Sequence, residues 1–208
     1  MAEKTADRRI LRTKRMIWDA LTELMEEKGF EGITVSDLTE KASIHRGTFY
    51  LHFRDKYDLL EQSEEVIIKG IQDIVYAIKS QKAVSYTNQD EPFPIIMKLC
   101  EYFQENSSYM KVILGPKGDP SFQVKIKELI KKAFIRKIAE ELKDEEMPVP
   151  VDYSLAYISA AHLGVIQHWL DSGMEKSPQE MTIILDCLVK QWRIFNSPQH
   201  AELNHYHS

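Results

Sequence analysis

The chain has 208 residues, of which 43% are hydrophobic and 28% charged, and its formal net charge is −5. This composition excludes disordered, collagen-like and fibrous chains. The two cysteines, Cys100 and Cys187, lie far apart without CxxC spacing, which excludes a disulfide framework or zinc ribbon. No apolar run approaches the roughly 18–20 residues that cross a bilayer, and the basic first residues do not resemble a secretory signal. We therefore expect a globular, cytoplasmic protein with no membrane contact.

Charge is unevenly distributed along the chain. Residues 1–56 have a balance of +1, whereas residues 57–208 have a balance of −6. A basic stripe near the start consists of Arg8, Arg9, Arg12, Lys14 and Arg15. A weakly basic head (residues 1–56) on an acidic body (residues 57–208) indicates two roles in one chain. A solvated helix face would account for the charge pattern equally well.

Helical periodicity predicts an all-α fold with about nine helices. The first helix is expected over residues 8–28, with Gly29 as its C′ residue. Its inner face is predicted to consist of Ile10, Ile17, Leu21 and Leu24. Thr34 and Asp37 have the spacing of a capping box that begins a second, short helix. A third short helix is expected over residues 45–52, and Asp55 is expected to begin a long fourth one.

The second half of the chain continues the helical pattern. Residues 82–94 are polar and contain prolines, which predicts a loop. Helices are expected over residues 95–106, 109–114 and 119–143, the last of these starting at Asp119-Pro120. Two final helices follow, and the second begins with a capping box at Ser177-Pro178-Gln179-Glu180. No strand and no internal repeat is predicted.

Residues 34–53 carry the functional signal. Two short helices joined by a tight turn must pack on a third helix, which is the helix-turn-helix arrangement that presents its second short helix to the DNA major groove. Arg46 can bind a guanine edge or a phosphate, Gly47 permits close approach, and Thr48 can contact a base. Tyr50, His52 and Lys56 can bind phosphates, whereas Phe49 and Phe53 should face the core. A plain helical corner is the alternative.

The segment GFEGITVSDLTEKASIHRGTFYLHFRDKYDLL resembles the N-terminal signature of TetR-family transcriptional regulators, over about residues 8–60. The resemblance implies a dimeric helical protein. Its helix-turn-helix domain, residues 1–56, would bind operator DNA, and residues 57–208 would dimerise and hold an effector. The DNA contacts of the family correspond to Thr34, Arg46, Gly47, Thr48, Tyr50, His52 and Lys56.

Two residues depart from the family pattern. His45 lies where Ser or Thr is usual; it can still donate to phosphate, but it is a poorer helix cap. Ser43 lies where Gly is usual, which carries a cost if that residue needs a positive φ.

The segment NSSYMKVILGPKGDPSFQVKIKELI is similar to a C-terminal region of TetR-like proteins that include activators of dihydroxyacetone kinase operons. That resemblance implies that the body can act through a protein partner instead of a small ligand.

The last two helices are the expected homodimer interface. Small residues would let another helix approach closely, and aromatic residues would supply apolar area. These residues are Ser159, Ala160, Ala161, Gly164, Trp169, Trp192 and Phe195. Packing within one protomer is the alternative. Two-fold symmetry would place the recognition helices about 34–36 Å apart, or a multiple of it, and the operator would be palindromic.

A small apolar effector would need a mostly apolar pocket with a few polar anchors. The candidates are Met97, Cys100, Tyr102, Phe103, Tyr109, Met110, Phe122, Phe134, Tyr157, His162 and Trp169. For each of them, membership of the core is the favoured alternative, and His162 and His168 are interpreted as core histidines. His200, His205 and His207 follow Pro198 without apolar periodicity, so we expect a frayed tail there and no metal or cofactor.

The leading hypothesis is a repressor released by an effector bound in the C-terminal domain. The alternative is a TetR-like regulator or coactivator controlled by a protein partner with no small ligand. Nucleophile-elbow, zinc-protease, P-loop and dinucleotide fingerprints are missing from the sequence, so we expect no enzyme activity.

Overall fold

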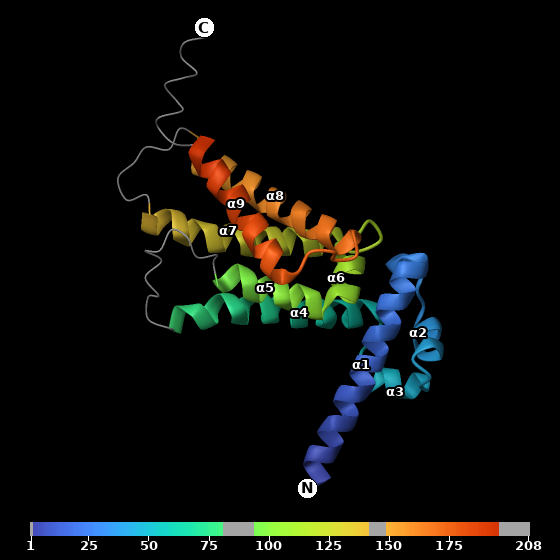
Figure 1. The fold of residues 1–208 in the computed structure, drawn as a ribbon. Helices are drawn as coiled ribbons and strands as arrows, with labels where there is room; N and C mark the ends of the chain where they lie inside the picture. Colours follow the sequence, from blue (N-terminus) through green and yellow to red (C-terminus); the bar gives the residue numbers. More distant parts are fainter. Residues whose placement is uncertain (1, 81–93, 142–148, 196–208) are drawn as a thin grey trace. The chain divides into compact units, whose positions relative to one another are not determined.

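The computed structural model describes residues 2–80, 94–141 and 149–195, and this part of the chain is all-α, with nine α-helices, a short 3-10 helix and no strand (Figure 1). The helices are α1 Ala2–Lys28, η1 Phe30–Gly32, α2 Val35–Lys41, α3 Arg46–Tyr50, α4 Lys56–Ser80, α5 Pro94–Glu105, α6 Ser107–Leu114, α7 Pro120–Glu141, α8 Val151–Asp171 and α9 Pro178–Phe195. The expected loop at residues 82–94 and the three C-terminal histidines lie outside the described residues, except for Pro94, which begins α5.

The chain forms two compact units. The first contains residues 1–69 and 106–122, and the second contains residues 70–105 and 123–208. Helices α4 and α7 therefore each begin in the first unit and continue in the second. The functional division expected between residues 56 and 57 stays a prediction.

The first unit is organised around the buried face of α1. Ile17, Leu21 and Leu24 are buried as expected, whereas Ile10 is 44% exposed. The expectation for Ile10 was wrong because α1 extends beyond its packing partners, and its first buried residue is Ile17. Helix α2 packs against α1, and α3 packs against α2.

Helix α1 ends where the glycine pattern predicted. The N–H of Gly29 donates to the carbonyl of Met25 over 2.9 Å, and the backbone of Gly29 has φ 73° and ψ 158°. That region is essentially restricted to glycine. The turn brings the chain directly into η1, which positions Thr34 to begin α2.

Helix α6 belongs to the first unit although it lies far along the chain. The Tyr109 hydroxyl and the Ser63 hydroxyl are 2.7 Å apart, and the Tyr109 ring meets the Trp18 ring edge to face at 5.3 Å. After α6, the Lys117 ammonium donates to the carbonyls of Glu26 (2.7 Å) and Glu27 (3.2 Å) in the last turn of α1. A cation at that end of a helix is favourable, so α6 and its following loop stabilise the head.

The second unit contains α5, α8, α9 and the larger part of α7. Helix α5 packs on α9, and α8 also contacts α9. The hydroxyl of Thr182, on α9, lies 3.7 Å from the sulfur of Met97. Burial raises the pKa of the neighbouring Cys100 thiol to about 11, although a hydrogen bond with Thr182 opposes the shift. Cys100 is therefore a neutral core thiol.

Two residues expected at the dimer surface are buried inside the second unit. Ser159 is 1% exposed and Trp169 is 2% exposed. The Trp169 indole N–H donates to the Lys176 carbonyl over 2.8 Å, which ties α8 to the loop before α9. Helical spacing did not reveal that Ser159 and Trp169 are buried, because spacing does not show which neighbouring segment covers a helix face. The side chains of Trp192 and Phe195 lie outside the described residues.

The predicted capping devices of the second half are confirmed. The Ser177 N–H donates to the Glu180 carboxylate (2.8 Å) and the Glu180 N–H donates to the Ser177 hydroxyl (3.2 Å), forming the capping box of α9. Asp119 accepts the N–H of Ser121 over 2.8 Å at the start of α7. Among the described helices, none has the length and apolar character of a membrane span.

Candidate nucleic-acid interface

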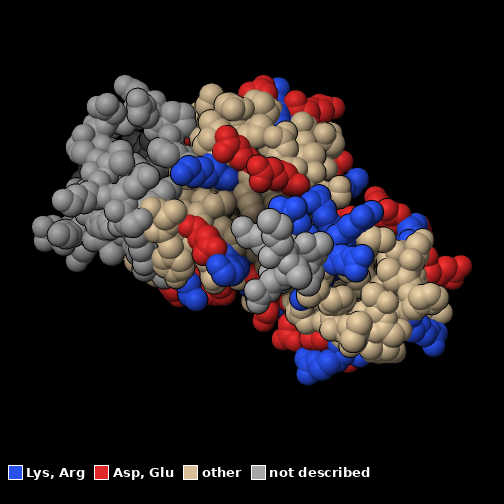
Figure 2. Space-filling view, turned by 90° about the horizontal axis from the view of Figure 1, so that it is seen from below, with Lys and Arg blue, Asp and Glu red and all other residues tan. Residues whose placement is uncertain are grey.

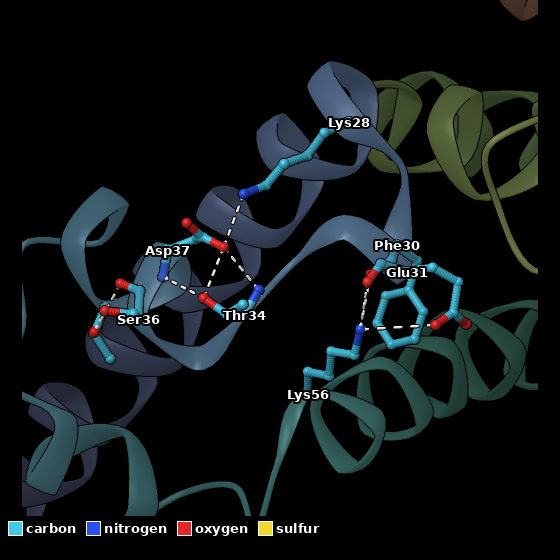
Figure 3. Close-up of polar contacts among 8 residues, drawn as sticks. Lys28, Phe30, Glu31, Thr34, Ser36, Asp37 and Lys56 are labelled. Carbon is cyan, nitrogen blue, oxygen red and sulfur yellow. Dashed lines mark hydrogen bonds and ion pairs between the residues drawn. The ribbon is translucent and has the colours of Figure 1, made fainter.

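The first support of the interface is the start of α2. Thr34 and Asp37 form the expected capping box: the Thr34 N–H donates to the Asp37 carboxylate over 2.8 Å, and the Asp37 N–H donates to the Thr34 hydroxyl over 3.2 Å (Figure 3). The Thr34 hydroxyl also donates to Asp37 over 2.7 Å. The side chain of Thr34, a candidate DNA contact, is therefore engaged in fixing the helix.

Ion pairs hold α2 against α1. The Lys28 ammonium lies 2.8 Å from Asp37, and the Lys41 ammonium lies 2.8 Å from Glu23 and 2.9 Å from Glu27. The hydrogen bond from Lys28, followed by those from Thr34, lowers the pKa of Asp37 to about 2. These pairs are partly exposed, so each adds little stability, but together they set the orientation of α2 on α1.

The turn between α2 and α3 carries the strain that the sequence suggested. Ser43 has φ 52°, a left-handed conformation that costs a non-glycine residue about 1–2 kcal/mol. The turn is closed by hydrogen bonds from the Ser43 N–H to the Glu40 carbonyl (3.0 Å) and from the Ile44 N–H to the Thr39 carbonyl (2.9 Å).

Helix α3 has one buried and one exposed side. Phe49 is 0% exposed, and its ring packs near those of Tyr50 (5.5 Å) and Phe53 (5.6 Å). The predicted inward direction of Phe49 and Phe53 is confirmed. His45 is the N-cap residue and makes no side-chain capping bond, as its departure from the family pattern predicted.

The candidate contact residues on and around α3 differ in accessibility. His45, Arg46, Gly47 and Tyr50 are exposed, and Thr48 and His52 are half-buried. A Cβ atom added at Gly47 would meet nothing within 4 Å. In the part of the chain that the structure describes, no hydrogen bond or ion pair engages the Arg46 guanidinium. These groups therefore remain accessible for a ligand.

Lys56 is placed differently from the other candidates. Its ammonium donates to the carbonyls of Phe30 (3.2 Å) and Glu31 (3.0 Å) and lies 4.8 Å from the centre of the Phe30 ring (Figure 3). Its side chain is 14% exposed. Lys56 thus ties the start of α4 to η1, and its role toward phosphate stays a prediction. The position of Lys56 in the sequence could not reveal that its ammonium group donates to the backbone carbonyls of Phe30 and Glu31.

The start of α4 is capped by Asp55, as predicted. Its carboxylate accepts the N–H groups of Tyr57 (2.9 Å) and Asp58 (2.8 Å). Asp58 in turn accepts the backbone N–H of Arg54 over 2.8 Å and its guanidinium over 3.2 Å. These bonds determine where the chain leaves α3 and enters α4.

The basic stripe on α1 is largely exposed. Figure 2 shows Lys and Arg side chains gathered on the face in view. Lys14 differs from the arginines, because its ammonium donates to Gln62 over 3.2 Å and lies 5.4 Å from the centre of the Phe53 ring. The exposed basic residues of the stripe are Arg8, Arg9, Arg12 and Arg15.

Sequence reasoning missed one residue of this surface. Leu51, which follows the last residue of α3, is 80% exposed, the highest value for a large apolar side chain among the described residues. A helical count from the buried Phe49 would have placed Leu51 on the outer side.

The effector candidates divide between the two compact units. Tyr109, Met110 and Phe122 are buried in the first unit, and Cys100, Phe103 and Trp169 are buried in the second. Met97 and Tyr102 are half-buried, and Tyr157 is 61% exposed. The ring Nδ1 of His162 lies 2.8 Å from the Ile158 carbonyl, and burial lowers its pKa. The side chain of Phe134 lies outside the described residues. The pocket stays a prediction.

Comparison with known families identifies the chain. A family model described as bacterial regulatory proteins, tetR family, matches residues 17–62, and a model described as transcriptional regulator C-terminal region matches residues 90–191. The chain belongs to the TetR family. The first match covers the two short helices and their supports, so the resemblance stated from the sequence is confirmed.

Relatives of this TetR-family chain are regulators and not enzymes, as expected. An uncharacterized HTH-type transcriptional regulator of Bacillus subtilis (strain 168), YxbF, is 43% identical over 60 residues. That match covers 28% of this chain but only 16% of the relative.

Solved structures share the fold. A TetR transcriptional regulator from Streptococcus agalactiae 2603V has a TM-score of 0.58 at 21% identity, covering 90% of this chain and 98% of that one. The dihydroxyacetone kinase operon activator DhaS has a TM-score of 0.53 at 20% identity (89% and 98% covered). FadR from Bacillus subtilis in complex with stearoyl-CoA has a TM-score of 0.58 at 18% identity (84% and 96% covered). The subgroup resembling DhaS stays a prediction for this TetR-family chain.

The lowered pKa of Asp37 predicts a pH-dependent contribution to stability. Because the pKa falls from 3.8 in the unfolded chain to about 2 in the folded one, the ionised carboxylate stabilises the fold above about pH 4, and this contribution is lost as the pH falls toward 2. We expect Asp37→Asn to lower the melting temperature slightly at pH 7, since exposed pairs contribute little stability, and the difference from wild type to narrow between pH 4 and 2.

Thermal unfolding followed by circular dichroism measures this difference. Glu40→Gln is the matched control, because Glu40 is an exposed carboxylate on the same helix and should change the melting temperature little. An Asp37→Asn difference that stays constant from pH 7 to 2 would contradict the assignment.

Proposed function

We propose that this TetR-family chain binds a palindromic operator in duplex DNA as a homodimer and regulates transcription. The observation that carries the proposal is the two-sided helix α3. Its buried Phe49 (0% exposed) anchors it to the head, while Arg46, Gly47 and Tyr50 remain exposed. A short helix held this way can enter the major groove with its polar side chains toward base edges and phosphates.

The exposed arginines of α1 support the same proposal. Arg8, Arg12 and Arg15 lie on the side of α1 opposite the buried Ile17 and Leu21, at ~100° per residue. Neutralising phosphates with arginine side chains releases counterions from DNA. We therefore expect DNA affinity to fall steeply as salt concentration rises.

The proposed dimer interface uses the outer faces of α8 and α9. Helix α9 has two apolar sides: Met181, Leu185 and Val189 are buried within the unit, whereas Ile184 and Leu188 are 36% and 42% exposed. On α8 the exposed residues include Tyr153, Tyr157, Ala160, Ala161 and Gly164. A Cβ atom added at Gly164 would meet nothing within 4 Å, so a second helix could approach there closely.

We further propose that the protein is a repressor released by a small apolar effector bound in the C-terminal domain. The fold shared with FadR, solved with stearoyl-CoA, supports this class of effector. An effector can lower DNA affinity only if it binds the conformation released from DNA more tightly than the conformation that binds DNA. Control by a protein partner is the second candidate, favoured by the similarity to the activator DhaS.

Arg46→Ala is expected to weaken binding to an operator selected from random duplexes by about 1–3 kcal/mol, because a base contact is removed. Footprinting at fixed salt measures the effect. Lys98→Ala, at an exposed position on α5, is the charge-matched control and should bind normally. Unchanged operator protection with Arg46→Ala would refute the role of Arg46.

Leu188→Lys is expected to weaken the dimer more than tenfold, since two-fold symmetry would bury a lysine from each protomer in an apolar interface. Sedimentation equilibrium measures the dissociation constant, and circular dichroism checks that helicity is retained. Val124→Lys, at an apolar position on α7 that is 59% exposed, should leave the dimer intact. A Leu188→Lys protein that dimerises like wild type would contradict this interface.

Stearoyl-CoA is the first probe for the effector class. At a hundred times its dissociation constant, a ligand stabilises by about 2.7 kcal/mol, which corresponds to roughly 5–10 °C in melting temperature for a chain of this size. We expect that shift together with weaker operator binding, and no response to coenzyme A without an acyl chain. No response to stearoyl-CoA or other apolar metabolites, with a stable heteromer recovered from cells, would favour the protein-partner alternative.

A further inference from the structure

The outer side of α3 is apolar where a DNA-reading helix would come closest to the bases. At ~100° per residue, Gly47 and Leu51 lie one turn apart, on the side opposite the buried Phe49. Leu51 is 80% exposed, and the space around Gly47 is open. Arg46 and Tyr50 lie to one side of this Gly47–Leu51 line and Thr48 to the other. The most exposed large apolar side chain of the described residues thus lies on the side opposite Phe49, and it has no hydrogen-bonding group.

The segment around Leu51 favours an anionic partner. From Lys41 to Arg54 the sequence contains no Asp or Glu, although the whole chain contains 32 acidic residues. Lys41 pairs with Glu23 and Glu27, and Arg54 pairs with Asp58, whereas no acidic residue among those described engages Arg46. An exposed leucine by itself needs no explanation. A highly exposed leucine at the C-cap of a helix with basic and hydroxyl neighbours suits a partner that presents phosphates at its edges and apolar groups between them.

Duplex DNA has that chemistry in its major groove. Of the groups on base edges there, the C5 methyl of thymine is the apolar one, and the others are hydrogen-bond donors and acceptors. The lack of a side chain at Gly47 removes the obstacle one turn before Leu51, so the backbone can approach the bases.

We propose that Leu51 contacts the C5 methyl group of a thymine in each operator half-site and selects that base by apolar contact. This inference rests on the proposed DNA-binding function and adds a specificity-determining residue to it. Leu51 accordingly requires an A·T pair at one defined position in the half-site, while Arg46 and Tyr50 bind groups on one side of it and Thr48 binds on the other.

Replacing thymine by deoxyuridine tests the contact atom by atom. Deoxyuridine keeps the pairing and the O4 acceptor and lacks only the methyl group. An operator is first selected from random duplexes with the full-length wild-type chain, and each thymine of the half-site is then replaced in turn. For the wild type we expect about fourfold weaker binding at one position per half-site, the loss corresponding to one methyl group.

The double-mutant cycle assigns that loss to Leu51. Leu51→Ala should bind the thymine operator more weakly and should be insensitive to deoxyuridine at the same position. Leu51→Met should retain the sensitivity, because its side chain still reaches the methyl group. Val124→Ala, on α7, should behave as wild type. Gly47→Ala should weaken binding to every duplex without lowering the melting temperature, since the added methyl group has free space in the protein.

The outcomes separate the inference from the function on which it rests. If an operator is selected and no deoxyuridine substitution weakens its binding, the role of Leu51 alone is overturned. The same holds if Leu51→Ala keeps the full deoxyuridine effect. Failure of the folded, full-length chain to select any duplex would overturn the DNA-binding function itself, and the inference with it.

Discussion

Burial of Phe49 is the constraint on which the candidate interface depends. Helix α3 has five residues, far fewer than a helix needs to persist by itself in water. Its conformation therefore comes from packing, through Phe49 at 0% exposure and Phe53 at 5%. With one side fixed in this way, the opposite side is held in place while Gly47 and Leu51 stay exposed, which is what a reading surface needs.

The supports of this small core are polar and lie at its edges. The capping box of α2, the Lys41 pairs with α1 and the Asp55 cap of α4 each fix one end of an element. Lys56 connects α4 to η1 through carbonyl groups. Each interaction is weak when exposed, yet together they determine the direction in which α3 faces. The charges thus divide into those that set the position of α3 and those, such as Arg46, that remain available to a ligand.

Much of this arrangement was predictable from local chemistry. Capping boxes, Gly29, the inward aromatic residues and the strained Ser43 follow from rules that involve a few neighbouring residues. The errors arose where the outcome depends on distant partners. Periodicity placed Ile10 on the inner face of α1 but could not show that α1 extends beyond the helices that pack on it. It also could not show that Trp169 is buried within its own unit. The carbonyl groups that engage Lys56 lie in η1, and its spacing in the sequence did not reveal them. The bond of Thr34 to Asp37 follows from the predicted capping box, and the DNA contacts of both residues stay predictions.

The contacts of Tyr109 and Lys117 with α1 and α4 determine which fragments of the protein could fold separately. The chain passes between the two compact units three times. A fragment cut after Lys69 would leave the Ser63 hydroxyl without Tyr109 and the final carbonyls of α1 without the Lys117 ammonium. A head that folds separately therefore requires residues 106–122 to be joined to it through a new linker. The other option is to replace Trp18 and Ser63 by residues suited to contact with water.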